Sequence, residues 1–146
     1  MARDGTDDDH CRMFFHDDAQ VLSETECQDL LASANFGRIA LTIRALPVVM
    51  PVNYGYLGGS VILGMSDGPA RRALAEENVI ALGVDSAHLS DVFWALLVIG
   101  KATEVTDLVQ RTQFQSLGLA DPTGTPASHY LQLQPDILTG YRTTTR

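Results

Sequence analysis

The residues with the clearest capacity to bind a ligand lie in one stretch, PVVMPVNYGYLGGSVILGM over Pro47–Met65. It predicts two antiparallel strands joined by a Gly-Gly turn at 58–59, because two glycines supply the positive φ angles of a two-residue hairpin. Pro51 cannot donate to a sheet ladder, so the first strand has an edge, a bulge or an opening near its middle. A strand that opens there and presents Asn53 and Tyr54 can line a ligand slot. The alternative is a hairpin that serves only as core.

A second candidate region follows directly, in SDGPARR at 66–72. Pro69 is a favourable first helical residue, so Arg71 and Arg72 fall in the first turn of a helix. A helix N-terminus and a nearby guanidinium group both favour an anion such as a phosphate. The alternative is that both arginines point to solvent and pair with the glutamates at 76–77 at helical spacing.

The other reactive side chains form no catalytic motif. The sequence contains no Ser-His-Asp, HExxH, Walker or GxGxxG pattern. His10, Cys11 and His16 lack the spacing of a structural zinc site, and the two cysteines give no disulfide framework. We therefore predict no metal site and no catalytic side chain, and we interpret His88 as solvated and His129 as structural.

The elements that would position these residues follow an antiparallel pattern. Ser23–Glu26 (SETE) is a capping box that begins a helix, which ends at Asn35-Phe36-Gly37. No βαβ rhythm is present, so the sequence predicts an antiparallel barrel with peripheral helices. Besides the hairpin at 47–65, we predict strands over 37–43, 78–85, 92–106 and 129–134, and a further short strand over 137–142. We also predict one helix that begins at 69 and another that spans 107–117.

Length and charge limit the class of protein. The chain has 146 residues and a net charge of −8, which argues against a nucleic-acid groove because such a groove needs a basic stripe. We predict an acidic, disordered tail over 1–20 and one domain over 21–146. The longest apolar run, at 92–100, is too short to span a bilayer, and no signal peptide is evident, so we predict a cytoplasmic protein.

Four segments together resemble the pyridoxamine 5′-phosphate oxidase-like family of flavin-binding split barrels. They are SETECQDLLASANFGRIALT, PVVMPVNYGY, GPARRALAEENVIALGVD and FWALLVIGKATEVTD. The resemblance covers residues 22–142. It implies a mainly β, six-stranded antiparallel split barrel with peripheral helices. It also implies a homodimer that binds FMN or a deazaflavin at the subunit interface.

The resemblance also implies which residues contact the cofactor. In the family the isoalloxazine ring lies along the strand that matches Val52, Asn53 and Tyr54, and the phosphate lies near 63–72. We therefore expect Met65 and Ser66 to contact the ribityl-phosphate arm and Arg71 to contact the phosphate. Trp94 would either close over the cofactor of the neighbouring subunit or pack the dimer interface.

Three features depart from the family pattern. Ala70 stands where relatives carry a phosphate-binding Lys, the basic residue often found near Gly64 is missing, and Ile99 stands where relatives often carry Arg. Charge-assisted hydrogen bonds from such residues contribute about 1.5–3 kcal/mol each, so their loss weakens the hold on a phosphate. Two hypotheses follow. The chain is a flavin- or deazaflavin-dependent oxidoreductase in which the cofactor does the chemistry, or it is a dimer that has lost the phosphate site and binds no cofactor or another ligand.

Overall fold

The computed structural model describes residues 19–76, 79–87 and 92–144. The predicted acidic tail lies almost wholly outside these residues, as do His10, Cys11, His16 and His88. No helix in the described part of the chain is long and apolar enough to cross a membrane.

Seven antiparallel strands form one sheet that closes on itself. The strands are β1 (Gln20–Val21), β2 (Phe36–Ile43), β3 (Leu46–Leu57), β4 (Ser60–Met65), β5 (Val79–Asp85), β6 (Val92–Glu104) and β7 (His129–Thr144). Their order is β1-β7-β4-β3-β2-β5-β6, and an additional β6–β7 pairing closes the ring. Among the described residues three helices lie around it: α2 (Glu24–Ser33), α3 (Pro69–Glu76) and α4 (Leu108–Gln115). The predicted split barrel with peripheral helices is confirmed, with the two-residue β1 added to the six strands.

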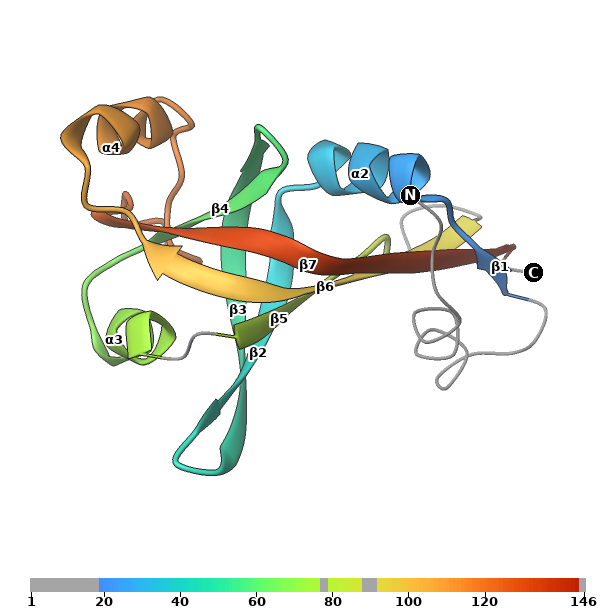
Figure 1. The fold of residues 1–146 in the computed structure, drawn as a ribbon, viewed down its shortest axis with the longest axis horizontal. Helices are drawn as coiled ribbons and strands as arrows, with labels where there is room; N and C mark the ends of the chain where they lie inside the picture. The colour runs from blue at the N-terminus through green and yellow to red at the C-terminus, as the bar shows by residue number, and fades with distance from the viewer. Residues whose placement is uncertain (1–18, 77–78, 88–91, 145–146) are drawn as a thin grey trace.

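The predicted division into a strand over 129–134 and a further short strand over 137–142 is wrong, because β7 runs as one strand of 16 residues. The pairing with β6 absorbs the irregularity. Its register shifts between Ile99 and Gly100, which pair with Ile137 and Pro135, so Asp136 is an extra residue on β7. Gly100 is required there, since a Cβ at this position would collide with the carbonyl oxygen of Gln134. In Figure 1, β6 and β7 consequently cross the whole molecule side by side.

The predicted helix start and hairpin turn are confirmed in detail. The Glu26 N–H donates to Ser23 Oγ at 3.1 Å, and the Ser23 N–H donates to Glu26 Oε1 at 3.2 Å, which completes the capping box of α2. Between β3 and β4, Gly58 and Gly59 have φ angles of 60° and 82°, as a type I′ turn requires. Both features arise from local residue chemistry.

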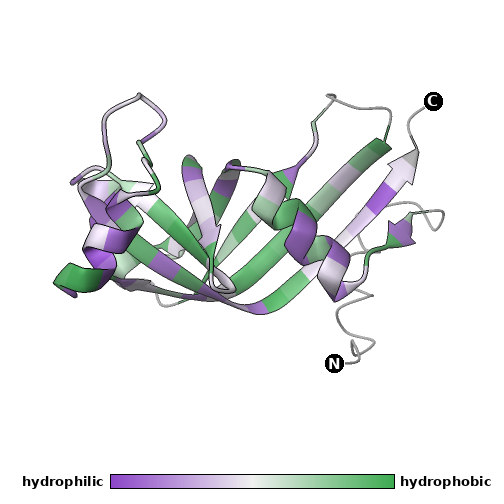
Figure 2. Ribbon diagram, turned by 90° about the horizontal axis from the view of Figure 1, so that it is seen from above, coloured by the Kyte–Doolittle hydropathy of each residue, from purple (hydrophilic) through white to green (hydrophobic). Residues whose placement is uncertain are grey.

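The barrel interior holds the main core, and α2 covers one side of it. Cys27 and Leu31 of α2 are fully buried, and α2 packs against β7. Figure 2 shows apolar residues recurring along the strands that enclose this core. Largest among its fully buried side chains are Tyr54, Leu22, Leu31, Ile39, Leu63, Leu74, Leu82, Leu131 and Leu133.

Candidate functional site

The predicted opening lies along one edge of β3. Residues 46–53 of β3 pair with β2, whereas β4 pairs with β3 only from Tyr54 to Leu57. The Tyr54 N–H donates to the Asn35 carbonyl at 3.0 Å. Backbone groups alternate in an antiparallel ladder, so those of Val49, Pro51 and Asn53 point away from β2, toward the side where β4 is absent. We call this the β3 edge.

The β3 edge explains why Pro51 is tolerated. Its missing N–H faces away from β2, so the β2–β3 ladder loses no hydrogen bond. The carbonyls of Val49, Pro51 and Asn53 and the N–H groups of Val49 and Asn53 have no strand partner on this side within the described residues. These groups can bind the polar rim of a planar ligand.

The three side chains predicted to contact the cofactor ring do not all face this edge. Val52 is 2% exposed and Tyr54 is 1% exposed, and both point into the barrel core. The Tyr54 hydroxyl donates to the Leu31 carbonyl at 2.6 Å, and burial raises the pKa of Tyr54 well above its ordinary value. Asn53 points outward, and its Nδ2 donates to the Ala120 carbonyl at 2.9 Å. A ligand at the β3 edge would therefore meet neither the side chain of Val52 nor that of Tyr54, and their backbone N–H and C=O groups point toward β2.

The segment between α4 and β7, residues 116–128, packs beside Asn53 and Ser66. A Cβ at Gly64 would lie 2.6 Å from the Cβ of Leu119, which shows how closely this segment approaches β4. Ser66 Oγ donates to Asp121 Oδ2 at 2.5 Å. This bond, with others from nearby threonines, lowers the pKa of Asp121 to about 2. Met65 points inward and belongs to the core.

Arg71 already has two carboxylate partners. Its guanidinium lies 2.8 Å from Asp67 Oδ1 and 3.2 Å from Glu104 Oε1. The hydrogen bond between Arg71 and Asp67 raises the pKa of the arginine and lowers the pKa of the aspartate. His129 Nδ1 lies 3.1 Å from the same Glu104 oxygen. A phosphate bound by Arg71 would have to displace a carboxylate. Arg72 is more exposed and lies 3.8 Å from Asp67.

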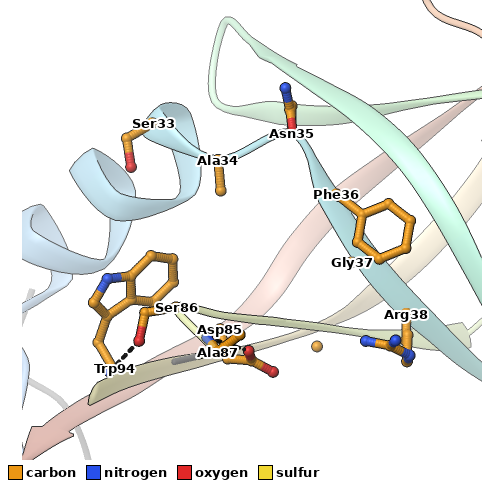
Figure 3. Close-up of a pocket in the computed structure, with 11 residues that line it drawn as sticks. Ser33, Ala34, Asn35, Phe36, Gly37, Arg38, Asp85, Ser86, Ala87 and Trp94 are labelled. Carbon is orange, nitrogen blue, oxygen red and sulfur yellow. Dashed lines mark hydrogen bonds between the residues drawn. The ribbon is translucent and has the colours of Figure 1, made fainter. Parts of the chain in front are cut away.

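Trp94 lines a pocket of about 530 Å³ on the opposite side of β2 from the β3 edge (Figure 3). We call it the Trp94 pocket. It is bounded by the end of α2 and the start of β2, by the end of β5, and by Trp94 of β6; its lining includes Ser33–Arg38, Gly83, Asp85, Ser86 and Ala87. The backbone N–H of Trp94 donates to Ser86 Oγ at 3.1 Å, and this hydrogen bond joins the ends of β5 and β6.

Sequence reasoning missed Phe36, Arg38 and Asp85 in this pocket. Phe36 and Arg38 lie on the outer face of β2, where the guanidinium is 5.6 Å from the centre of the ring. Asp85 Oδ1 accepts the Ala87 N–H at 2.7 Å. The available signal was the alternation along Phe36–Ile39. Gly37 and Ile39 are buried, whereas Phe36 and Arg38 are exposed on the other face.

The outer face of the sheet carries a row of apolar residues across four strands. Val49, Ala40, Ala81 and Ile99 are successive cross-strand neighbours on β3, β2, β5 and β6. Val49 is 65% exposed and the nearby Val79 is 61% exposed. A shallow groove of about 300 Å³ runs beside them. Contiguous exposed apolar surface of this kind is typical of a protein interaction site.

No group of three His, Cys, Asp or Glu side chains in the described part of the chain is arranged to hold a metal ion. The cluster around Arg71 is therefore an ion-pair network. Its carboxylates are held by Arg71 and His129.

Comparisons with known proteins agree with this architecture. A profile of the pyridoxamine 5′-phosphate oxidase family matches residues 23–142. The chain is 33% identical over 128 residues to the uncharacterized protein Rv0080 of Mycobacterium tuberculosis, which covers 83% of each chain. An FAD binding protein from Mycobacterium smegmatis is 26% identical, with a TM-score of 0.72 over 86% of this chain and 98% of that one.

A second solved structure shares the fold at lower identity. An FAD-binding protein from Mesorhizobium loti is 16% identical, with a TM-score of 0.71 over 86% of this chain and 99% of that one. The profile match spans nearly all of the described residues, and the two mycobacterial relatives match along 83% and 98% of their lengths. The chain belongs to the pyridoxamine 5′-phosphate oxidase family.

Proposed function

We propose that the chain is a flavin-dependent oxidoreductase that works as a homodimer. The observation that carries this proposal is the family match over 23–142, together with flavin-binding proteins among the relatives that share the split barrel. A bound flavin would supply hydride or electron transfer, while the protein would position and desolvate its ring. This accounts for a chain in which no catalytic side-chain motif is found.

The β3 edge fits a flavin ring. One rim of an isoalloxazine ring carries several carbonyl and ring-nitrogen groups, and the edge offers unpaired backbone groups of Val49, Pro51 and Asn53. We infer that FMN or a deazaflavin binds there through backbone hydrogen bonds, with the Asn53 amide adding a side-chain contact. In a dimer, Trp94 of the partner subunit would lie near the ring or pack the interface beside it.

The region near Arg71 fits a phosphate less well. Ala70 supplies no charge, and Arg71 is paired with Asp67 and Glu104. Ser66, the residue expected on the ribityl-phosphate arm, donates its hydroxyl to Asp121. We infer that the ring supplies most of the affinity, so that FMN and riboflavin bind with similar strength. A family member with a free cationic group would instead favour FMN strongly.

The apolar row formed by Val49, Ala40, Ala81 and Ile99 supports the proposed dimer. A second copy seated on this face would cover the exposed Val49 and Val79 and would complete the site beside the β3 edge. Light scattering in solution tests this, with a mass of two chains expected and a monomer at high concentration contradicting it.

The pairing of Arg71 with two carboxylates favours a second candidate function, a dimer that binds no flavin and takes another ligand. The absorption spectrum of the purified protein, with mass spectrometry of whatever heat releases, separates the two. A flavin or deazaflavin at near-stoichiometric occupancy supports the enzyme. A colourless protein that also ignores added flavins and deazaflavin supports the second candidate.

A further inference from the structure

The Trp94 pocket has aromatic side chains on two of its walls. Figure 3 shows Trp94 and Phe36 on opposite sides of it, carried by β6 and β2. Phe36 is 41% exposed, so its ring is available for contact. The volume of about 530 Å³ lies within the range of about 300–1,000 Å³ typical of small-molecule sites. Trp94 offers an aromatic surface to a planar ring, whereas the Phe36 ring already carries the Arg38 guanidinium at 5.6 Å.

Two opposite charges face the same space. Arg38 has no carboxylate within ion-pair distance among residues 19–76, 79–87 and 92–144. Asp85 Oδ1 accepts the Ala87 N–H, and within the described residues Oδ2 accepts no side-chain or Ala87 hydrogen bond. The pocket therefore offers a strong donor from one wall and a strong acceptor from its floor.

The pocket does not favour an anionic ligand. Besides Asp85, its upper wall is the C-terminal end of α2 at Ser33 and Ala34, which carries the partial negative charge of the helix dipole. A carboxylate or phosphate would gain from Arg38 and lose against both of these groups. A ligand with no net charge gains from Arg38 and Asp85 together.

We propose that the Trp94 pocket binds a neutral planar heteroaromatic lactam. The ring packs against Trp94, the lactam carbonyl accepts a hydrogen bond from Arg38, and the lactam N–H donates to Asp85, with Phe36 holding the Arg38 guanidinium at the rim of the pocket. Phe36 pairs with Asn53, so this ligand would lie one strand away from the β3 edge. That position suits a second substrate of the proposed flavin enzyme, although binding itself needs no flavin.

Calorimetric titration of the flavin-free, full-length protein with 2-quinolinone tests the proposal. Two matched compounds accompany it: 2-methoxyquinoline lacks the N–H donor, and quinoline-2-carboxylate carries a negative charge. We expect saturable binding of 2-quinolinone, at least fivefold weaker binding of the other two, and quenching of Trp94, which is the only tryptophan of the chain. The margin follows from one lost hydrogen bond to a charged group in a partly exposed site, about fivefold to tenfold.

Three variants locate the binding. Arg38→Gln and Asp85→Asn each should weaken 2-quinolinone binding by about fivefold to tenfold. The amide introduced by Asp85→Asn keeps an oxygen for the Ala87 N–H, so the local turn is preserved. Arg44→Gln is the matched control, since Arg44 is an exposed arginine of the β2–β3 turn outside this pocket, and it should bind like the wild type.

Several results would overturn the proposal. Binding of 2-quinolinone that neither variant changes would mean that the ring alone is held. Tighter binding of quinoline-2-carboxylate would assign the pocket to anions. Absence of binding, with a dimer that dissociates in the Arg38→Gln variant, would mean that the partner subunit fills the pocket. Flavin binding is measured separately, so failure here leaves the proposed oxidoreductase untouched.

Discussion

Replacing Tyr54 with Phe tests which way the central strand faces. Tyr54 is 1% exposed, and its hydroxyl donates to the Leu31 carbonyl at 2.6 Å. That carbonyl lies in the last turn of α2, where the helix has no N–H of its own to offer. Tyr54→Phe removes the hydrogen bond and leaves the carbonyl buried. It does not alter the backbone groups of the β3 edge.

The expected loss of stability combines two effects. A net hydrogen bond contributes about 1 kcal/mol, and an unsatisfied buried carbonyl adds about 1–3 kcal/mol when no water reaches it. Since part of the second cost is relieved by relaxation, we expect Tyr54→Phe to lower the free energy of unfolding by about 1–3 kcal/mol. Urea denaturation at pH 7 measures this. Flavin affinity, measured at urea concentrations below the unfolding transition, should stay within about twofold of the wild type. This change is smaller than the change in affinity that the loss of one neutral hydrogen bond would cause.

The difference between the two proteins should depend on pH. Burial raises the pKa of Tyr54 above its ordinary value of 10.0. Above pH 10 the unfolded chain therefore loses the phenol proton while the folded chain keeps it, and the stability of the wild type falls as pH rises. The Tyr54→Phe variant has no such proton to lose. The stability advantage of the wild type should therefore shrink by up to about 1.4 kcal/mol per pH unit above pH 10.

Two results would refute this reasoning. Equal stability of wild type and Tyr54→Phe would mean that the hydrogen bond from the Tyr54 hydroxyl to α2 does not stabilise the fold. Unchanged stability with flavin affinity reduced tenfold or more would mean that the Tyr54 side chain contacts the ligand, as the family resemblance implies.

Three further changes test other parts of the account. Substituting Asp67→Asn together with Glu104→Gln releases Arg71, so affinity for FMN should rise about tenfold relative to riboflavin in fluorescence titrations, and an unchanged ratio would contradict the account of Arg71. Val49→Asp places a charge in the apolar row and should yield a monomer by light scattering; a persistent dimer would place the interface elsewhere. Gly100→Ala drives a Cβ against the Gln134 carbonyl and should cost about 3 kcal/mol or more in urea denaturation, whereas a loss below about 1 kcal/mol would refute the close approach.

Features with a local code could be predicted from the sequence. Ser23 and Glu26 make reciprocal hydrogen bonds across three residues, and the Gly58-Gly59 turn depends on two φ angles. Pro51 indicated a missing ladder partner, and the strand pairing has the gap at that place. Each of these depends on residues adjacent in the chain, so no knowledge of tertiary packing is needed.

Features that depend on distant residues could not be predicted. The two strands predicted over 129–134 and 137–142 form one strand, because a register shift against β6 keeps it continuous. From the sequence, the glutamates at 76–77 were the expected partners of Arg71. In the structure Arg71 of α3 pairs with Glu104, which lies on β6. Phe36, Arg38 and Trp94 line the same pocket only because the ends of α2, β5 and β6 converge there.

The predicted ring contacts show the difference between two kinds of inference. Alternation along β3 places Val52 and Tyr54 on the same apolar face, and that face points inward. The assignment of these residues to the ligand came from the family resemblance, which matches positions along the strand without distinguishing side chain from backbone. The alternation indicates that neither side chain reaches the β3 edge, where the backbone groups of Val49, Pro51 and Asn53 lie instead.

The most direct test of flavin binding is a calorimetric titration of the flavin-free protein with riboflavin, FMN, FAD and a deazaflavin. We expect saturable binding of one flavin per chain and similar dissociation constants for riboflavin and FMN, because Arg71 is already paired. A dissociation constant above about 1 mM for every compound, equivalent to less than about 4 kcal/mol of binding free energy, would contradict the proposed flavin site. A preference of a hundredfold or more for FMN over riboflavin would contradict the account of Arg71 and restore the phosphate contact that the family resemblance implies.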